Sequence, residues 1–303
     1  MPSCLPPIVA GLDCARHPRE ETMADPHAPT PVRREDHGAV ARLVLSSPQN
    51  YNALSREMIA ALRDALDAIA ADEAVRVVVI AAEGKAFSAG HDLRQMQAAR
   101  GDTDGGRGAY ESLFSDCAAL MQAIPALPQP VIAEVQGIAT AAGCQLVASC
   151  DIAVAAEGTR FGVNGVNIGL FCSTPMVAVT RAIPAKAAFE LLTTGAFIDA
   201  ARAAELGLVN RVVPADRLTA ETMALAQTVA AKLPAAIRMG KRAFQAQRGL
   251  SLADAYAQAG EVMCENMMLP DTDEGLTAFL EKRPPAWADQ PIRASAGKVS
   301  SSQ

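Results

Sequence analysis

Cysteine and histidine are the residue types in this chain that could bind a metal, form disulfides or pair as nucleophile and base. The seven cysteines are an odd number and no Cys-x-x-Cys occurs, which fits neither a disulfide framework nor a zinc ribbon. Three of the four histidines, His17, His27 and His37, precede the expected folded body. We therefore expect no metal site and a reducing compartment.

Motifs for other common chemistries are missing. The chain has no Gly-x-Ser-x-Gly nucleophile elbow, no P-loop and no dinucleotide fingerprint. Cys172 could act as a nucleophile, but the sequence places no histidine partner near it, and we expect a buried structural thiol. Asp92 and Asp151 are expected to cap or begin secondary-structure elements and not to act as bases.

Composition and charge limit the class of protein. Of the 303 residues, 50% are hydrophobic and 20% are charged, which is typical of a chain with a packed core. The formal net charge of −6 argues against nucleic acid as a partner. No apolar run approaches the roughly 18 residues that span a bilayer. Because the N-terminus lacks a basic segment before its short apolar stretch, we expect no signal peptide and a cytoplasmic protein with no membrane partner.

Strands and helices are expected to alternate through the first two thirds of the chain. Ser55 should cap a helix whose buried stripe would be Met58, Ile59, Leu62, Leu66 and Ile69. Apolar runs predict strands over residues 39–46, 75–82, 131–135 and 151–157. This pattern predicts an α/β core with a helical C-terminal extension.

We expect four regions. Residues 1–37 are a disordered extension, 38–214 the α/β core, 215–287 a helical region and 288–303 a flexible tail. Within the core, the polar and Gly-rich stretch 96–107 is expected to be a loop, and 160–174 is expected to be turn-like.

Two loops carry a resemblance to a known family. They are FSAGHDL (87–93) and ATAAGCQL (139–146), followed by LTTGAFIDAARAAELGLVNRVVP (192–214) and DEGLTAFLEKR (273–283). In this order they resemble the crotonase, or enoyl-CoA hydratase/isomerase, superfamily over about residues 38–287. The stretches TAAGCQLVASCDIAVA and GVNIGLFCSTP look still closer to one branch of it. The resemblance implies a crotonase-like spiral of ββα units with a C-terminal helical trimerisation region.

The chemistry that this resemblance implies uses acyl thioesters of coenzyme A. Negative charge develops on the thioester oxygen as an enolate forms, and two backbone N–H groups stabilise that oxygen. By resemblance, the donors are the N–H groups of His91 and Ala142. The family uses the backbone at the first position, so we do not expect the imidazole of His91 to act as a base.

The resemblance also implies how coenzyme A would bind. The ligand would run over His91, Asp92, Leu93, Arg94 and Ala142. Lys282 would meet its 3′-phosphate from a neighbouring subunit, and Phe279 would flank the adenine. No tightly bound cofactor is implied, since coenzyme A is part of the substrate. Family members assemble as homotrimers or as dimers of trimers.

Two positions depart from the family pattern. Its hydratases carry glutamates where this chain has Gln145 and Gly165. An amide is no acid or base at neutral pH, and glycine has no side chain. Positioned proton transfer contributes roughly 10²–10⁴-fold in rate, so ordinary hydratase activity should be weak or absent.

Two functions therefore stay open. One is an enzyme of the enoyl-CoA hydratase/isomerase type, a lyase or isomerase acting through an enolate. The other is a non-catalytic acyl-CoA-binding regulatory homologue in fatty-acid metabolism. A third reading, an RNA-binding protein of the same fold, is disfavoured by the negative charge.

Overall fold

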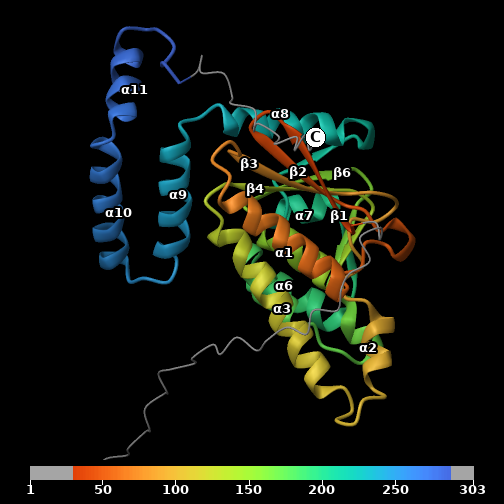
Figure 1. Ribbon diagram of the computed structural model, residues 1–303. Coiled ribbons are helices and arrows are strands. Elements are labelled where there is room, and N and C mark those ends of the chain that lie inside the picture. Colours follow the sequence, from red (N-terminus) through yellow and green to blue (C-terminus); the bar gives the residue numbers. More distant parts are fainter. Residues whose placement is uncertain (1–29, 288–303) are drawn as a thin grey trace, which may run out of the picture.

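A mostly parallel sheet forms the centre of the computed structural model, which describes residues 30–287 (Figure 1). Its order is β1-β2-β3-β4-β6-β9, and only β1 runs antiparallel to its neighbour. The strands are β1 (Val32–His37), β2 (Val40–Leu45), β3 (Val77–Ala82), β4 (Val131–Val135), β6 (Ile152–Ala156) and β9 (Arg211–Val213). A second sheet has the order β5-β7-β8, with β5 (Ile138–Thr140), β7 (Arg160–Gly162) and β8 (Phe197–Asp199).

Helices cover both faces of the large sheet. One face packs against α1 (Arg56–Ala70), α3 (Arg107–Ala126) and α4 (Ala142–Ser149), and the other against α8 (Leu218–Ala230). Successive side chains of a strand point to opposite faces of the sheet. Because helices cover both faces, the side chains on both sides of these strands are apolar. In β3, for example, Val78 and Ile80 belong to the first core and Val77 and Val79 to the second.

The helix expected after Ser55 is confirmed as α1. The Ser55 side chain accepts a hydrogen bond from the N–H of Met58, which satisfies one of the free donors at the helix start. The five apolar residues expected on its buried stripe are all in the core.

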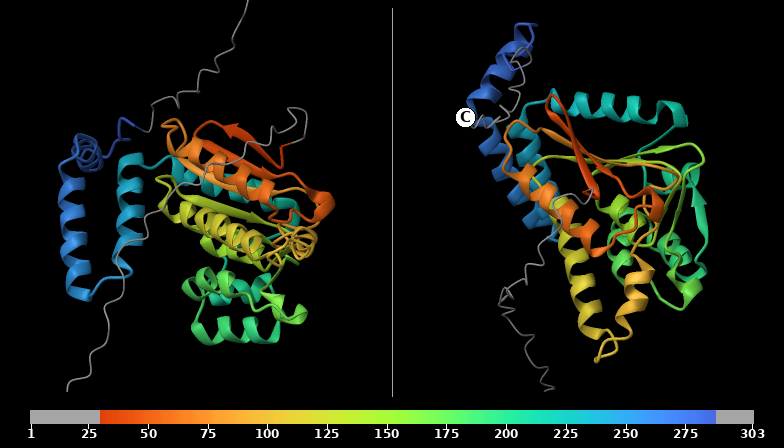
Figure 2. Two further views of the ribbon diagram at one scale, coloured as in Figure 1. Left: turned by 60° about the horizontal axis from the view of Figure 1, so that its bottom comes forward. Right: turned by 45° about the vertical axis from the view of Figure 1, so that its right-hand side comes forward.

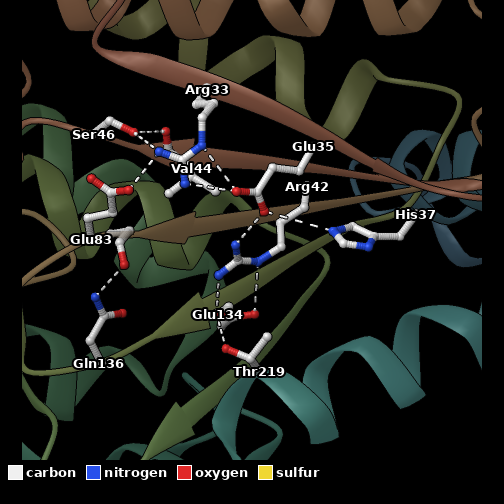
Figure 3. A network of polar contacts seen from close by, with 11 residues as sticks. Arg33, Glu35, His37, Arg42, Val44, Ser46, Glu83, Glu134, Gln136 and Thr219 are labelled. Carbon is white, nitrogen blue, oxygen red and sulfur yellow. Dashed lines mark hydrogen bonds and ion pairs between the residues drawn. The ribbon is translucent and has the colours of Figure 1, made fainter.

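The first strand corrects the expected disordered extension of residues 1–37. Residues 32–37 form β1, which pairs with β2 from Val32 opposite Leu45 to His37 opposite Val40. Ion pairs hold this charged edge strand in place (Figure 3): Arg33 binds Glu83, and Glu35 binds Arg42. Cross-strand partners thus order a segment that looks solvated in the sequence. Residues 1–29 and the expected tail 288–303 lie outside the described residues.

The same network continues across the sheet to α8. Arg42 also binds the buried carboxylate of Glu134, which accepts a hydrogen bond from Thr219 (Figure 3). A carboxylate in this position is stable only because charged and hydroxyl donors meet it. This polar network therefore connects β2, β4 and the start of α8.

Two further predictions are corrected. The stretch 96–107 is partly helical, because α2 (Leu93–Ala99) extends into it. The turn-like segment 160–174 contains β7, a 3₁₀ turn η2 (Asn164–Ile168) and the start of a helix, α5 (Ser173–Ala182), that the sequence did not predict. Pro175 obscures this helix in the sequence, but in the first turn it removes no intrahelical hydrogen bond.

From α5 to residue 287 the chain is mostly helical, apart from the short strands β8 and β9 and the connections. Two helices of the core follow α5, namely α6 (Ala185–Thr194) and α7 (Ala200–Leu206), and short 3₁₀ turns lie at η1 (Pro48–Asn50) and η3 (Ala215–Arg217). After α8 come α9 (Pro234–Gln247), α10 (Leu252–Met267) and α11 (Pro270–Leu280). Helices α9 and α10 stand side by side next to the core (Figure 2). Within residues 30–287, no helix combines the length and the apolar character needed to cross a membrane.

Candidate functional site

The two loops singled out in the sequence meet at Gly90. A Cβ built on Gly90 would lie 2.9 Å from the Cβ of Ala141, 3.0 Å from the carbonyl oxygen of Thr140 and 3.1 Å from the nitrogen of Ala142. Backbone hydrogen bonds hold the same contact, because Thr140 N–H donates to the carbonyl oxygen of Ser88 over 3.0 Å. Only glycine allows this approach, and its φ of +87° also favours glycine.

Backbone N–H groups at this contact are free to bind a ligand. Among the described residues, neither the N–H of His91 nor that of Ala142 donates a hydrogen bond within the protein. Ala142 is the first residue of α4, so its N–H belongs to the unpaired first turn and carries the partial positive charge of a helix start. The preceding Ala141 has a φ of +49°, an unusual conformation that fixes the direction of this turn.

The imidazole of His91 contacts two other residues of the protein core region, Leu54 and Phe114. Its Nδ1 lies 3.2 Å from the carbonyl oxygen of Leu54, and its ring packs edge-on against Phe114 with centroids 5.7 Å apart. The carbonyl is an acceptor only, so Nδ1 carries the proton. Burial lowers the pKa of His91, which the hydrogen bond to Leu54 partly offsets. The Nδ1 nitrogen and the ring face of His91 are thus engaged with Leu54 and Phe114, while its backbone N–H stays free.

The residues expected to contact coenzyme A beside His91 lie at the start of α2. Asp92 caps that helix, accepting hydrogen bonds from the N–H groups of Arg94 and Gln95. Leu93 and Arg94 are exposed, and no carboxylate pairs with Arg94 among the described residues. A free cation and an exposed apolar side chain are thus next to the contact between the loops.

Gln145 lies one helical turn after Ala142 in α4. Its side chain is 4% exposed, and its Oε1 has no hydrogen-bond partner among the described residues. An unpartnered amide oxygen in such a position is unusual and costs stability. This unpaired oxygen lies on the same helix as the free N–H of Ala142, three residues further on.

Gly165 is buried in η2, and the structure leaves no room for a side chain there. A Cβ would lie 2.3 Å from the carbonyl oxygen of Leu170 and 2.8 Å from the Sγ of Cys172. The thiol of Cys172 also accepts the N–H of Gly165 over 3.3 Å. The loop is held beside the site by Thr140, whose hydroxyl donates to Asn164 Oδ1 over 2.6 Å.

The thiols near the site are suited to packing. Cys172 is buried, and burial raises its pKa, in agreement with the expected structural role. Burial also raises the pKa of Cys144 in the first turn of α4 to about 12, and the neighbouring Cys172 adds to the shift. Cys144 lies in the first turn of α4 and Cys172 directly precedes α5, so the two helices begin side by side. The five described cysteines are all free thiols.

Phe279 and Lys282 lie elsewhere in this chain. Phe279 is 80% exposed on α11, and Lys282 follows the end of that helix with a φ of +57°. Helix α11 stands apart from the two loops (Figures 1 and 2). The structure thus does not bring these residues to His91 within one chain.

The sequence reasoning missed a buried ion pair at the end of α4. Lys241 in α9 donates to Asp151 over 2.6 Å and to the carbonyl oxygens of Ile124 and Gln129 over 2.9 Å each. Burial lowers the pKa of Lys241 and raises that of Asp151, while each charge opposes the shift of the other. The partners are 90 positions apart, and no sequence pattern joins them over that separation. Over residues 30–287, no group of three or more metal-ligating side chains is found.

Comparison with known proteins gives consistent matches over the folded part of the chain. The family model of enoyl-CoA hydratase/isomerase matches residues 35–290. Enoyl-CoA hydratase domain-containing protein 3, mitochondrial, of Xenopus laevis is 46% identical over 261 residues, which are 86% of this chain and 87% of the relative.

Solved structures match equally well. The crystal structure of an enoyl-CoA hydratase from Mycobacterium smegmatis is 52% identical with a TM-score of 0.82, covering 86% of this chain and 99% of that one. The human enoyl coenzyme A hydratase domain-containing protein 3 is 42% identical with a TM-score of 0.81, covering 85% and 100%. The expected α/β fold with C-terminal helices is thereby confirmed.

One sequence-based expectation is contradicted by these comparisons. A cytoplasmic protein was expected because the N-terminus lacks a secretory signal. The relatives from Xenopus laevis, Danio rerio, Mus musculus and Homo sapiens all carry the word mitochondrial in their names. The absence of a secretory pattern does not distinguish the cytoplasm from an organelle, which is why the expectation was wrong.

Proposed function

The chain belongs to the enoyl-CoA hydratase/isomerase family, and from this premise we propose that it binds acyl-CoA thioesters between its two loops. The thioester oxygen would accept hydrogen bonds from the N–H groups of His91 and Ala142. The observation that carries the proposal is the pair of free N–H groups on loops that touch at Gly90. Such preorganised donors stabilise an enolate oxygen without reorganising during the reaction.

Proton transfer is the weak part of this site. Gln145 can orient a water molecule or a substrate amide or hydroxyl, but its amide does not exchange protons at neutral pH. Gly165 contributes nothing beyond its backbone, and its surroundings exclude a side chain. We therefore propose an enolate-stabilising protein with weak or no ordinary hydratase activity. The second candidate is a non-catalytic acyl-CoA-binding regulatory protein of fatty-acid metabolism, favoured by the same two positions.

Hydration of crotonyl-CoA tests the catalytic part. We expect near-background turnover for the natural chain and a measurable gain in Gln145→Glu, because one carboxylate is then restored in a buried position that already holds an isosteric amide. Gln145→Ala serves as the matched control and should show no gain. Wild-type turnover near ~10 s⁻¹, the ordinary enzyme value, would contradict the proposal.

Calorimetry with acetyl-CoA tests the binding part. We propose that Lys282 of a neighbouring subunit contacts the 3′-phosphate in a homotrimer or dimer of trimers, so Lys282→Ala should weaken binding. Lys186→Ala, which removes an exposed lysine on α6, is the control and should leave the affinity unchanged. If no acyl-CoA binds at all, both candidate functions fail. Binding without turnover of any thioester in an acyl-CoA panel would favour the regulatory protein.

A further inference from the structure

The free N–H of His91 belongs to the peptide group between Gly90 and His91, and the carbonyl end of that group is held in place. The N–H of Leu54 donates to the carbonyl oxygen of Gly90 over 2.7 Å. In a planar trans peptide the C=O and N–H bonds point in opposite directions. The hydrogen bond from Leu54 therefore sets the direction in which the N–H of His91 points.

The side chain of His91 binds the other backbone group of Leu54. Its Nδ1 lies 3.2 Å from the carbonyl oxygen of Leu54 and carries the proton. Leu54 and His91 also form an isolated parallel β-bridge. Leu54 is fully buried, so its N–H and its C=O meet the Gly90 carbonyl and the imidazole in a fixed place. One residue thus joins the imidazole to the peptide group that carries the free donor.

Neighbouring N–H groups of the same turn have acceptors within the protein. The N–H of Ala89 donates to the carbonyl oxygen of Tyr51 over 3.0 Å, and that of Gly90 donates to the hydroxyl of Ser88 over 3.3 Å. Among residues 30–287, the N–H of His91 is left without such an acceptor. The free donor next to Gly90 is therefore that of His91, and its direction depends on the Gly90–His91 peptide.

Packing alone does not account for a histidine at this position. The ring packs edge-on against Phe114, as an apolar side chain could. Its Nε2 is buried without a hydrogen-bond partner among the described residues, which costs stability. Across the same residues, the hydrogen bond that the ring does make is the one to Leu54. That hydrogen bond is the feature that distinguishes this imidazole from an apolar side chain of similar size.

We propose that the imidazole of His91 is a positioning group for the backbone N–H of the same residue. By binding the carbonyl of Leu54, it holds the residue whose N–H fixes the carbonyl of Gly90, so the peptide group does not rotate when the thioester oxygen binds. Donors that already point at the oxygen stabilise its negative charge without reorganising. The proposal rests on the proposed function, since it requires that the thioester oxygen accepts a hydrogen bond from this N–H.

Two variants of equal shape test this role. In His91→Asn the amide nitrogen takes the place of Nδ1 and can still donate to Leu54, whereas His91→Leu has the same size and no donor. Calorimetry measures the affinity for acetyl-CoA, and infrared spectroscopy of acetyl-CoA isotopically labelled at the thioester carbonyl measures a C=O stretch that falls as the oxygen accepts hydrogen bonds. We expect His91→Leu to lose most of the wild-type frequency shift and to bind about tenfold more weakly, the effect of one hydrogen bond. His91→Asn should retain both.

Phe114→Leu is the matched control, because it removes the ring packed against His91 and leaves the hydrogen bond to Leu54. It should keep the wild-type frequency shift. Nitrogen NMR of the histidine ring in the wild-type protein needs no variant, and it should show the proton on Nδ1 because that atom faces a carbonyl oxygen.

The possible failures are distinguishable. A wild-type frequency shift that persists in His91→Leu overturns this inference and leaves the proposed function standing. Equal losses in His91→Leu and His91→Asn overturn it as well, because the ring then only fills space. A wild-type proton on Nε2 overturns it even if no variant folds. If acetyl-CoA does not bind the wild-type protein, or binds without a frequency shift, the proposed function fails too.

Discussion

Gly90 joins the two loops of the site because it has no side chain. Its φ is positive, and any Cβ would touch three atoms of the facing loop. Gly105 offers a matched comparison, since its φ of +68° is also positive but no atom lies within 4 Å of a Cβ built there. Comparing alanine variants at these two positions therefore distinguishes the effect of backbone strain from the effect of displacing the loop.

We predict that Gly105→Ala lowers the free energy of unfolding by about 1 kcal/mol, because alanine is strained at positive φ. Gly90→Ala should lower it further, because its Cβ also clashes with the facing loop. Only Gly90→Ala should also weaken acetyl-CoA binding, by roughly tenfold, since it displaces the N–H of Ala142. Urea unfolding and calorimetry measure the two effects. Equal affinity in both variants would show that the loop contact does not position the donor.

His91 gives a pH dependence whose sign follows from burial. Its pKa is lowered in the folded protein, so the unfolded chain binds the proton more readily, and stability is lost as the pH falls through the unfolded value of about 6.5. We predict that wild-type protein loses stability relative to His91→Gln between pH 7.5 and 5.5. The slope can reach about 1.4 kcal/mol per pH unit for one proton. Urea unfolding across this range measures it, with the exposed His37→Gln as control, and a parallel profile for all three proteins would refute the prediction.

At the level of elements, the pair Lys241–Asp151 fastens α9 to the core. We predict that Lys241→Met destabilises the protein by about 3–5 kcal/mol, because it leaves a buried carboxylate and two carbonyl oxygens without their donor. The double variant with Asp151→Asn should lose less than the sum of the single losses. Breaking the exposed pair Arg202–Glu205 should cost under about 1 kcal/mol. Additive losses in the first cycle, measured by chemical unfolding, would mean that the two side chains act independently.

The elements also show what the sequence could and could not predict. Helix α1 was predictable because its cap and apolar stripe are local features. Strand β1 was missed because it is held by partners distant in the sequence, which lie in β2 and after β3. The hydrogen bonds of Lys241 were missed for the same reason, since their acceptors lie far along the chain. At the site, the motifs indicated which residues lie together, but the exclusion of a side chain at Gly165 follows only from the packing of Leu170 and Cys172.

At the level of the whole molecule, the C-terminal helices leave large apolar side chains in solvent. On α10, Leu252 is 77% and Tyr256 73% exposed, one helical turn apart on the same face. Exposed apolar patches of this kind mark association surfaces. This fits the proposed homotrimer or dimer of trimers.

We predict that the double variant Leu252→Glu/Tyr256→Glu sediments as a smaller species than the wild type, because buried charge opposes association. Tyr51→Asn changes an exposed aromatic residue far from α10 in the sequence and should leave the sedimentation unchanged. Analytical ultracentrifugation at micromolar concentration checks this. A monomeric wild-type protein would contradict both the prediction and the proposed assembly.

The packing around Gly165 also limits what protein engineering can introduce there. Any side chain at that position meets the carbonyl oxygen of Leu170 as well as the Cys172 thiol, so a smaller side chain at position 172 alone does not make room. A carboxylate at position 165 would require the turn before α5 to move. Position 145, in contrast, already holds a side chain of the size of glutamate.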